Sequence, residues 1–410
     1  MRVVLLHYTA PPVVGGVETV LACQARLLAD AGHEVTVVAA RGRTPDRRVR
    51  FARVPRADTR HPDVLAAQAA LDAGAVPSGF ARLRSSLEAA LRAAVVDTDV
   101  LIAHNVCSLH KNLALTAALH RLNGMPRMPR LVAWHHDLAW TAARYQAQLH
   151  PGEPWDLLRR AWPGVAHVAV SDDRRASSAE LFGLDPTLVS VIPNGLDRDA
   201  FLGLGARTRA LLAPLALADA APILFLPARI APRKNIELAV RVLAELRAAG
   251  DDARLLVTGA PDPHDPASAS LLRQLRSLRS RLGLENAAHF LAEDGKGLAE
   301  PVVADLYRVA DALFLPSRDE GFGLPVLEAA VSRLPVFCAD LPAVRAIART
   351  AATYFAADAD PAAVARIVRS RLAADPAYEL AVRARRRYDW QRIYREQIGP
   401  LLERVTAGVA

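Results

Sequence analysis

The 410-residue chain has only three cysteines, few aromatic residues and no long uninterrupted hydrophobic stretch. Cys23, Cys107 and Cys338 lie far apart in apolar surroundings, without the spacing of a disulfide framework or a metal site. We therefore expect free thiols in a reducing compartment. The most apolar stretch, 211–228, contains three prolines and an aspartate, which argue against a membrane-spanning helix.

The net charge and the aromatic content limit the classes of binding partner that the sequence suggests. The net charge is +8 and aromatic residues make up 5% of the chain. Basic and aromatic residues do not alternate as they do in single-strand binders, so no nucleic-acid partner is predicted. A basic surface suits anionic small molecules or an acidic membrane surface, although a simple solvated surface is the plainer interpretation. Residues 1–8 lack the features of a signal peptide, so we expect a cytoplasmic protein.

Two phosphate-binding signatures are missing. The chain has no Gly-Lys-Ser/Thr loop, and Gly15-Gly16 do not fit the dinucleotide-binding Gly-x-Gly-x-x-Gly pattern. Gly203-Leu204-Gly205 matches that pattern in part but follows no predicted strand. A nicotinamide-dependent dehydrogenase is therefore a poor interpretation.

The chain contains the same strand–loop–helix–strand pattern twice. Units of this length indicate parallel sheets, and two of them indicate an α/β protein with two Rossmann-like domains. The predicted units are 3–8, 17–31 and 34–40 in the first half, and 223–226, 235–249 and 254–258 in the second.

Further apolar runs add strands to both halves, and Pro193-Asn194-Gly195 is a turn signal that places the domain boundary. We predict an N-terminal domain at 1–195 and a C-terminal domain at 196–387. We predict a helical segment at 74–95. Its arginines, Arg82, Arg84 and Arg92, could contact a membrane surface or an acceptor, or be exposed to solvent. The additional predicted strands are 99–103, 131–134, 165–170, 189–192, 288–291, 312–315 and 335–338.

Polar residues gather where the predicted strands end, which is where open α/β sheets bind ligands. Arg229 and Lys234 lie in one strand-to-helix loop, and the next helix, capped by Asn235, directs its N–H groups to the same place. Two cations and a helix N-terminus suit a diphosphate.

The stretch 319–328 follows another buried strand. It carries Glu320 in a glycine-rich loop, and Glu328 about one turn into the next helix. Gly321 and Gly323 let backbone N–H groups approach a ligand. Glu320 can accept hydrogen bonds from sugar hydroxyls, and Glu328 can bind both hydroxyls of a ribose, so the stretch favours a nucleotide sugar.

His135, His136 and Asp137 also follow a strand directly. One histidine can bind a sugar hydroxyl or a developing charge, with Asp137 orienting it or the acceptor. A structural histidine and a zinc site using His7 or His104 are the alternatives. Downstream aromatic side chains suit either sugar stacking or core packing. These are Trp140, Tyr145 and Trp155.

These motifs together resemble the retaining glycosyltransferases of the GT-B fold, and glycosyltransferase family 4 in particular. The resemblance covers nearly the whole chain, in order. It rests on Gly15-Gly16-Val17-Glu18, His136-Asp137, Ile192-Pro193-Asn194-Gly195-Leu196-Asp197, Arg229 with Lys234, Glu320 with Glu328, and a C-terminal helix containing Trp390.

The resemblance implies two Rossmann-like domains facing each other across a cleft, with a helix at about 388–410 packing back on the N-terminal domain. It implies no metal and no cofactor beyond the nucleotide sugar. The implied catalytic residues are His136, Glu320, Arg229 and Lys234. The implied donor-binding residues are Gly16, Arg229, Lys234, Glu320, Phe322, Gly323, Leu324 and Glu328. The candidate acceptor-binding residues are Gly15, His104, His135, Asp137, Trp140 and Tyr145.

The implied activity is transfer of a hexose from a UDP- or GDP-sugar to an acceptor hydroxyl, with retention at the anomeric carbon. The acceptor, whether a small molecule, glycan or lipid, stays open, as does peripheral membrane contact. A nucleotide-sugar epimerase of the same fold and a non-catalytic nucleotide-sugar binding protein are the alternatives. The segment 262–266 lengthens the loop after Gly259 and either shapes the donor site or is an insertion.

Overall fold

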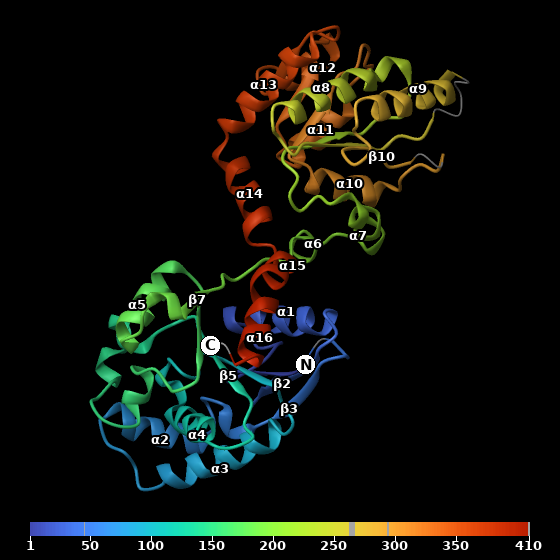
Figure 1. The fold of residues 1–410 in the computed structure, drawn as a ribbon. Coiled ribbons are helices and arrows are strands. Elements are labelled where there is room, and N and C mark those ends of the chain that lie inside the picture. The colour runs from blue at the N-terminus through green and yellow to red at the C-terminus, as the bar shows by residue number, and fades with distance from the viewer. Residues whose placement is uncertain (45, 262–266, 293–294, 409–410) are drawn as a thin grey trace. The chain divides into compact units, whose positions relative to one another are not determined.

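The computed structural model describes residues 1–44, 46–261, 267–292 and 295–408. The chain divides into two compact units (Figure 1). The first unit contains Met1–Leu196 and Trp390–Ala410, and the second contains Asp197–Asp389. In the described residues no helix is long and apolar enough to cross a membrane.

The first unit is built on a seven-stranded parallel sheet with strand order β3-β2-β1-β4-β5-β6-β7. The order reverses direction between β1 and β4, as in Rossmann folds. The strands are β1 Arg2–Leu6, β2 Glu34–Ala39, β3 Arg50–Arg53, β4 Val100–His104, β5 Arg130–His135, β6 Ala166–Ala169 and β7 Val189–Val191.

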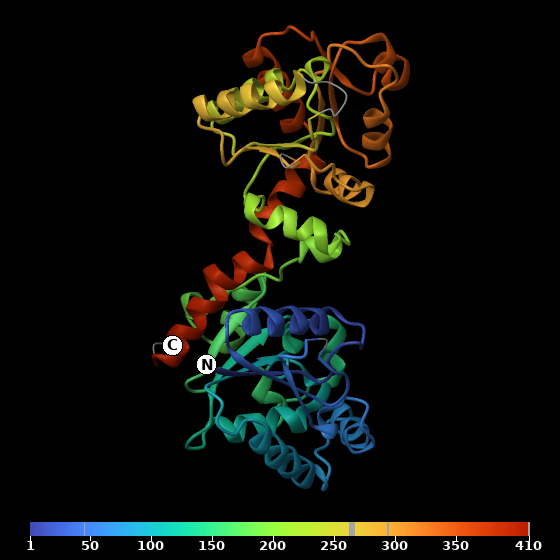
Figure 2. The ribbon, with the colours of Figure 1, turned by 90° about the vertical axis from the view of Figure 1, so that its right-hand side faces the viewer.

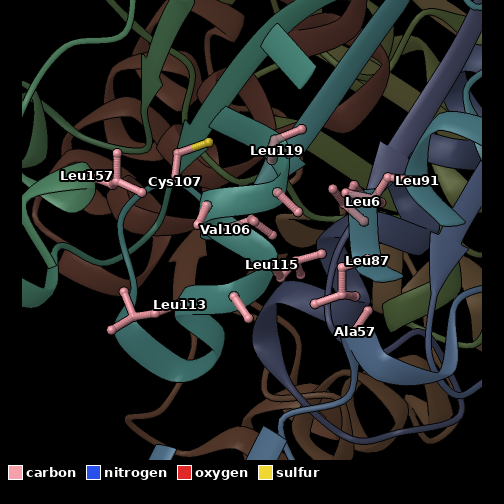
Figure 3. Packing of buried hydrophobic residues seen from close by; sticks show 14 of the residues in the cluster. Leu6, Ala57, Leu87, Leu91, Val106, Cys107, Leu113, Leu115, Leu119 and Leu157 are labelled. Carbon is pink, nitrogen blue, oxygen red and sulfur yellow. The ribbon is translucent and has the colours of Figure 1, made fainter. Parts of the chain in front are cut away.

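Helices cover both faces of this sheet, because its central strands are apolar on both sides. Figure 2 shows α1 on one face, with α3 and α4 on the other. Figure 3 shows part of the core under α3 and α4, in which Leu87 of α3 lies near Leu115 of α4 and Leu91 lies near Leu6 of β1. The helices are α1 Gly16–Asp30, α2 Pro62–Asp72, α3 Phe80–Ala94, α4 Leu113–Asn123 and α5 Asp172–Phe182.

The C-terminal segment completes the core of the first unit. It consists of α15 Trp390–Ile393, a π-helical turn Tyr394–Ile398 and α16 Gly399–Thr406. Its apolar residues join the core on the α1 face, and Tyr394 hydrogen-bonds His33 at 2.8 Å. A Cβ at Gly195 would lie 2.6 Å from the Trp390 ring, so glycine permits this packing.

The second unit repeats the plan with six parallel strands in the order β10-β9-β8-β11-β12-β13. Its order reverses between β8 and β11. The strands are β8 Ile223–Leu226, β9 Arg254–Val257, β10 Ala288–Phe290, β11 Ala312–Leu315, β12 Val336–Ala339 and β13 Thr353–Phe355.

The helices of the second unit also form two layers. Helices α8, α9 and α13 contribute to one core, and α7, α10, α11 and α12 to the other. They are α6 Arg198–Phe201, α7 Ala206–Leu212, α8 Ile236–Ala248, α9 Ala267–Arg281, α10 Glu300–Val309, α11 Leu324–Val331, α12 Pro342–Ala348, α13 Pro361–Ala373 and α14 Pro376–Arg387.

The predicted α/β class with two Rossmann-like domains, as in the GT-B fold, is confirmed by the two parallel sheets. The predicted strands 223–226 and 312–315 match β8 and β11 in their bounds. The structure adds α2, β3 and β13, which the sequence analysis did not predict. The helix expected at about 388–410 begins at Trp390 in the structure and is divided into α15, the π-helical turn and α16.

Candidate functional site

The strand order of the second unit marks a ligand site. In open α/β sheets, ligands bind beyond the carboxyl ends of the two strands between which the order reverses. Here those strands are β8 and β11. The loop after β8 carries Arg229 and Lys234, and the loop after β11 carries Glu320. The topology therefore brings Arg229, Lys234 and Glu320 to one edge of this sheet.

Lys234 and Glu320 form an ion pair at the centre of this site. Lys234 Nζ lies 2.5 Å from Glu320 Oε1, and the two side chains are only 11% and 7% exposed. Ser317 Oγ donates to the same carboxylate oxygen at 2.6 Å, and an Arg233 guanidinium nitrogen lies 3.9 Å from Oε2. The carboxylate is thus held by three side chains, one from its own loop and two from the loop after β8.

Asn235 joins the two loops. Its Nδ2 donates to the carbonyl oxygens of Pro316 at 3.0 Å and Ala357 at 2.9 Å. Its Oδ1 accepts from Arg318. It occupies the N-cap position of α8 as predicted, with a φ of 51°, but its side chain bonds no helix N–H group. Asn235 is therefore a cross-link that fixes Lys234, its neighbour, relative to β11.

Gly259, which follows β9, allows the backbone of the Arg229 loop to pass close by. A Cβ at Gly259 would lie 1.9 Å from the carbonyl oxygen of Ala228 and 2.4 Å from Arg229 Cα. Ile230 forms a parallel bridge with Pro261, and its N–H donates to Ala260. No side chain fits at position 259 unless the loop that carries Arg229 moves.

Helix α11 begins at the same edge. Its N-cap, Gly323, has a φ of 100°, a left-handed conformation that favours glycine. The backbone N–H groups of Phe322 and Gly323 donate to no acceptor in the described parts of the chain. Two open donors next to a helix N-terminus create a positive local potential suited to an anion.

Glu328, one turn into α11, is held by a residue that the sequence analysis missed. Tyr307, on α10, donates its hydroxyl to Glu328 Oε2 at 2.5 Å. Burial raises the pKa of Tyr307 well above its usual range, and the Glu328 carboxylate adds to this shift. The phenol therefore stays protonated and keeps donating its hydrogen bond. Glu328 itself is exposed and keeps its other oxygen available.

The first unit has its own set of polar groups at its reversal point, between β1 and β4. His7 follows β1, and its Nδ1 donates to the carbonyl oxygen of His104 at 2.9 Å. Its Nε2 lies 3.8 Å from the Glu18 carboxylate, which also accepts from Thr9. Gly15 accommodates that carboxylate, because a Cβ there would lie 2.0 Å from it.

His136 lies beside this group, at the end of β5. Its ring stacks on the ring of His104, with centroids 5.4 Å apart, and its Nε2 lies 3.1 Å from His104 Nδ1. Burial lowers the pKa of His136 to about 3, and His7 adds to the shift. His136 is therefore neutral at physiological pH. His104 is completely buried, which places it behind His136 and out of reach of an acceptor.

His135 faces the opposite side of the strand. It is 1% exposed, its Nε2 lies 3.0 Å from His167 Nδ1, and both rings pack against Phe182. Burial lowers the pKa of both histidines, that of His167 to about 4. Of the two adjacent histidines, only His136 is placed for ligand contact, and His135 belongs to the packing beneath α5.

The remaining acceptor candidates lie on the loops that follow β5. Asp137 pairs with Arg144 at 3.2 Å. Arg144 and Lys111 both lie over the Tyr145 ring, at 4.7 and 4.6 Å from its centroid. Trp140 is partly buried, donates to the carbonyl oxygen of Trp155 and lies under Arg159. Trp155 itself is in the core.

Two predictions concern metals and the loop after Gly259. In the described parts of the chain, no three His, Cys, Asp or Glu side chains are grouped closely enough to hold a metal ion. The zinc alternative that joined His135 or His136 with His7 or His104 therefore has no ligand set there. The segment 262–266 lies outside the described residues.

Two Rossmann-like units, each with polar groups at its reversal point, are typical of the GT-B fold. Residues 14–200 match the family model described as Glycosyltransferase Family 4, and residues 209–387 match the one described as Glycosyl transferases group 1. Together the two matches cover most of both units. The chain belongs to the glycosyltransferases of family 4.

Curated relatives are similar to about half of this chain. The chain is 33% identical over 211 residues to D-inositol 3-phosphate glycosyltransferase of Geodermatophilus obscurus, which is 50% of this chain and 45% of that protein. It is 31% identical over 214 residues to the serotype-specific mannosyltransferase WbdA of Escherichia coli, or 50% and 24% of the two chains. The chain thus spans half or less of the length of these curated relatives.

Among solved structures, sucrose-phosphate synthase from Thermosynechococcus elongatus aligns over 99% of both chains. The sequence identity is 20% and the TM-score is 0.40.

Proposed function

We propose that this protein transfers a hexose from a UDP- or GDP-sugar to an acceptor hydroxyl, with retention at the anomeric carbon. The observation that carries the proposal is the buried Lys234–Glu320 pair at the reversal point of the second unit. It sits where nucleotide ligands of this fold class bind. The family membership and the names of the relatives support the same reaction class.

The second unit offers a separate group for each part of the donor. Arg229, Lys234 and the open N–H groups at Phe322 and Gly323 suit the diphosphate. The Glu328 carboxylate, held by Tyr307, suits the ribose hydroxyls.

Donor binding would rearrange the central ion pair. A diphosphate oxygen that reaches Lys234 competes with Glu320 for the same ammonium group. Once Lys234 turns to the diphosphate, Ser317 still holds one Glu320 oxygen, and the other can accept from a sugar hydroxyl. One charged pair thus supplies both an anion site and a sugar site.

In the proposed reaction the bond between the anomeric carbon and the diphosphate oxygen breaks. The acceptor oxygen forms a new bond to that carbon on the same face, and its proton passes to the leaving phosphate oxygen. Negative charge grows on the diphosphate as the bond breaks. Preorganised cations lower such a barrier, and removing one typically costs about 10²–10³ in rate.

We also assign roles to residues of the first unit. We assign His136 to the transferred sugar, because it is a neutral imidazole at the carboxyl edge of the sheet. Gly16, the first residue of α1, is assigned to backbone contact with the donor phosphate. Gly15, Asp137, Trp140 and Tyr145 remain the candidates for acceptor contact. No metal is assigned, so transfer should persist in EDTA.

The test begins with a thermal-shift screen of UDP-, GDP- and ADP-sugars, because a ligand of the native state raises its melting temperature. The stabilising sugar is then incubated with candidate acceptors, and released nucleotide and product are measured. An acceptor-dependent α-linked product supports the proposal. Epimerised sugar or nucleotide released without an acceptor indicates the epimerase alternative, and binding without turnover indicates a binding protein.

A further inference from the structure

His136 is held from two sides by residues of one neighbouring strand end. We propose that His104 and Asn105, at the end of β4, are positioning residues for His136. Asn105 fixes its backbone and His104 fixes its ring, so that His136 presents Nδ1–H at the edge of the sheet. The catalytic part of this inference rests on the proposed transfer reaction, whereas the geometric part does not.

Asn105 holds the turn that carries His136. Its Oδ1 accepts from the backbone N–H of His136 at 2.8 Å and from that of Asp137 at 3.1 Å. Asn105 is 3% exposed and has a φ of 60°, a conformation that asparagine tolerates better than most residues. Its own N–H donates to the carbonyl oxygen of Trp134, so both strand ends are tied together.

His104 holds the ring. It is fully buried, and His7 fixes its backbone by donating Nδ1–H to its carbonyl oxygen. The stacked rings of His104 and His136 share one hydrogen bond, between His104 Nδ1 and His136 Nε2. Burial lowers the pKa of both, so each ring is neutral and carries one proton.

The surroundings decide which ring donates. His104 Nε2 is buried and has no partner in the described parts of the chain. If His136 donated, the proton of His104 would sit on this nitrogen as a buried donor without an acceptor, which proteins rarely tolerate. If His104 donates through Nδ1–H, its Nε2 carries no proton, and only the lone pair of that nitrogen lacks a hydrogen-bond partner. His136 then accepts at Nε2 and carries its proton on Nδ1.

The consequence is chemical as well as geometric. With Nε2 occupied, the free nitrogen of His136 can act only as a hydrogen-bond donor, and its direction is set by His104. A donor with a fixed direction suits a sugar oxygen, and misplacing such a group by about 1 Å can cost about 10²-fold in rate. His104 would act through His136 without touching a substrate.

The direct test is the tautomer of His136, read by ¹H–¹⁵N NMR on protein labelled with ¹⁵N-histidine and assigned with His136→Gln. We expect the Nδ1–H form in the wild type and in His104→Asn, because the amide nitrogen of asparagine replaces the Nδ1 donor. We expect a mixture or the Nε2–H form in His104→Leu. An Nε2–H tautomer in the wild type overturns the inference, whatever the activity proves to be.

The kinetic test uses the stabilising donor sugar. His104→Leu should lower kcat/KM by about tenfold or more, which is the size expected for one lost orienting hydrogen bond. His104→Asn should stay within about threefold of the wild type. The dissociation constants for UDP and GDP should not change, because those groups lie in the second unit. If His104→Leu turns over like the wild type, His104 does not position a catalytic group.

Two further variants separate positioning from stability. Asn105→Gly keeps the left-handed backbone but removes the two accepted hydrogen bonds, and should lower kcat/KM about tenfold. His167→Leu removes a matched buried histidine–histidine hydrogen bond away from the edge. It should lower the melting temperature yet leave kcat within about twofold. If His167→Leu and His104→Leu lose kcat equally, the two histidines have only a structural role, and His104 does not position His136.

If the wild type turns over no nucleotide sugar, the proposed function fails and the NMR result alone decides the geometric part of this inference.

Discussion

The buried pair of Lys234 and Glu320 makes the sharpest prediction, because removing one partner should impair both donor binding and stability. Lys234→Met keeps the aliphatic stem but leaves the Glu320 carboxylate with only Ser317 and the more distant Arg233. Breaking one side of a buried pair costs about 3–5 kcal/mol when nothing compensates. Because some compensation remains here, we expect about 2–3 kcal/mol.

The stability effect is measured by calorimetry or urea unfolding of the whole chain. In a unit of this size, each kcal/mol shifts the melting temperature by about 2–4 °C, so Lys234→Met should melt about 5–10 °C lower. The double variant Lys234→Met/Glu320→Gln removes both charges and should recover to within about 1 kcal/mol of the wild type. Both variants should lose turnover by about 10²-fold or more.

This combination separates the two roles of the pair. A folded double variant with normal stability and no activity shows that the charges are needed for chemistry and not for folding. Near-normal turnover in Lys234→Met at saturating donor would refute the diphosphate assignment. A double variant as unstable as the single one would refute the account of the pair as mutually compensating charges.

Three further predictions follow from the geometry. Tyr307→Phe removes the hydroxyl that holds Glu328 and should raise the donor Kd about tenfold by titration calorimetry, with an unchanged Kd counting against a ribose role for Glu328. Gly259→Ala forces the Arg229 loop to move and should weaken UDP or GDP binding about tenfold or more, whereas Gly297→Ala, where a Cβ meets nothing within 4 Å, should bind normally. His136 and His167 stay neutral in the folded protein down to pH values of about 3 and 4, while the unfolded chain takes up protons near 6.5. The contribution of these histidines to the free energy of unfolding should therefore be complete above about pH 6.5 and decrease as the pH drops toward 4. Urea unfolding at several pH values should show a smaller decrease for His167→Leu than for the wild type.

The sequence predicted the two sheets because their central strands are short apolar runs followed by turn residues. Strands β8 and β11 stand out for this reason. Strand β3, Arg50–Arg53, was missed because it lies at an edge of its sheet and has an arginine at each end. Strand β13, a three-residue edge strand, was missed as well.

For the candidate site, the sequence predicted which loops meet but not which side chains support them. Lys234 and Glu320 could be placed together because both follow strands that end at the same edge. Tyr307 could not, since it comes from a helix that precedes β11 and no pattern links it to Glu328. Spacing alone could not separate the two histidines at the end of β5, although the family resemblance favoured His136. In the structure their stacking partners, His104 and His167, distinguish them.

The return of residues 390–405 to the first unit has a consequence for how the protein is made. Trp390, Leu401 and Leu402 belong to the same core as Leu5 and Leu21. A nascent chain paused on the ribosome before Trp390 would already carry every residue of the second unit. The first unit would still lack one wall of its core, so the part synthesised first cannot close until the whole second unit has been translated.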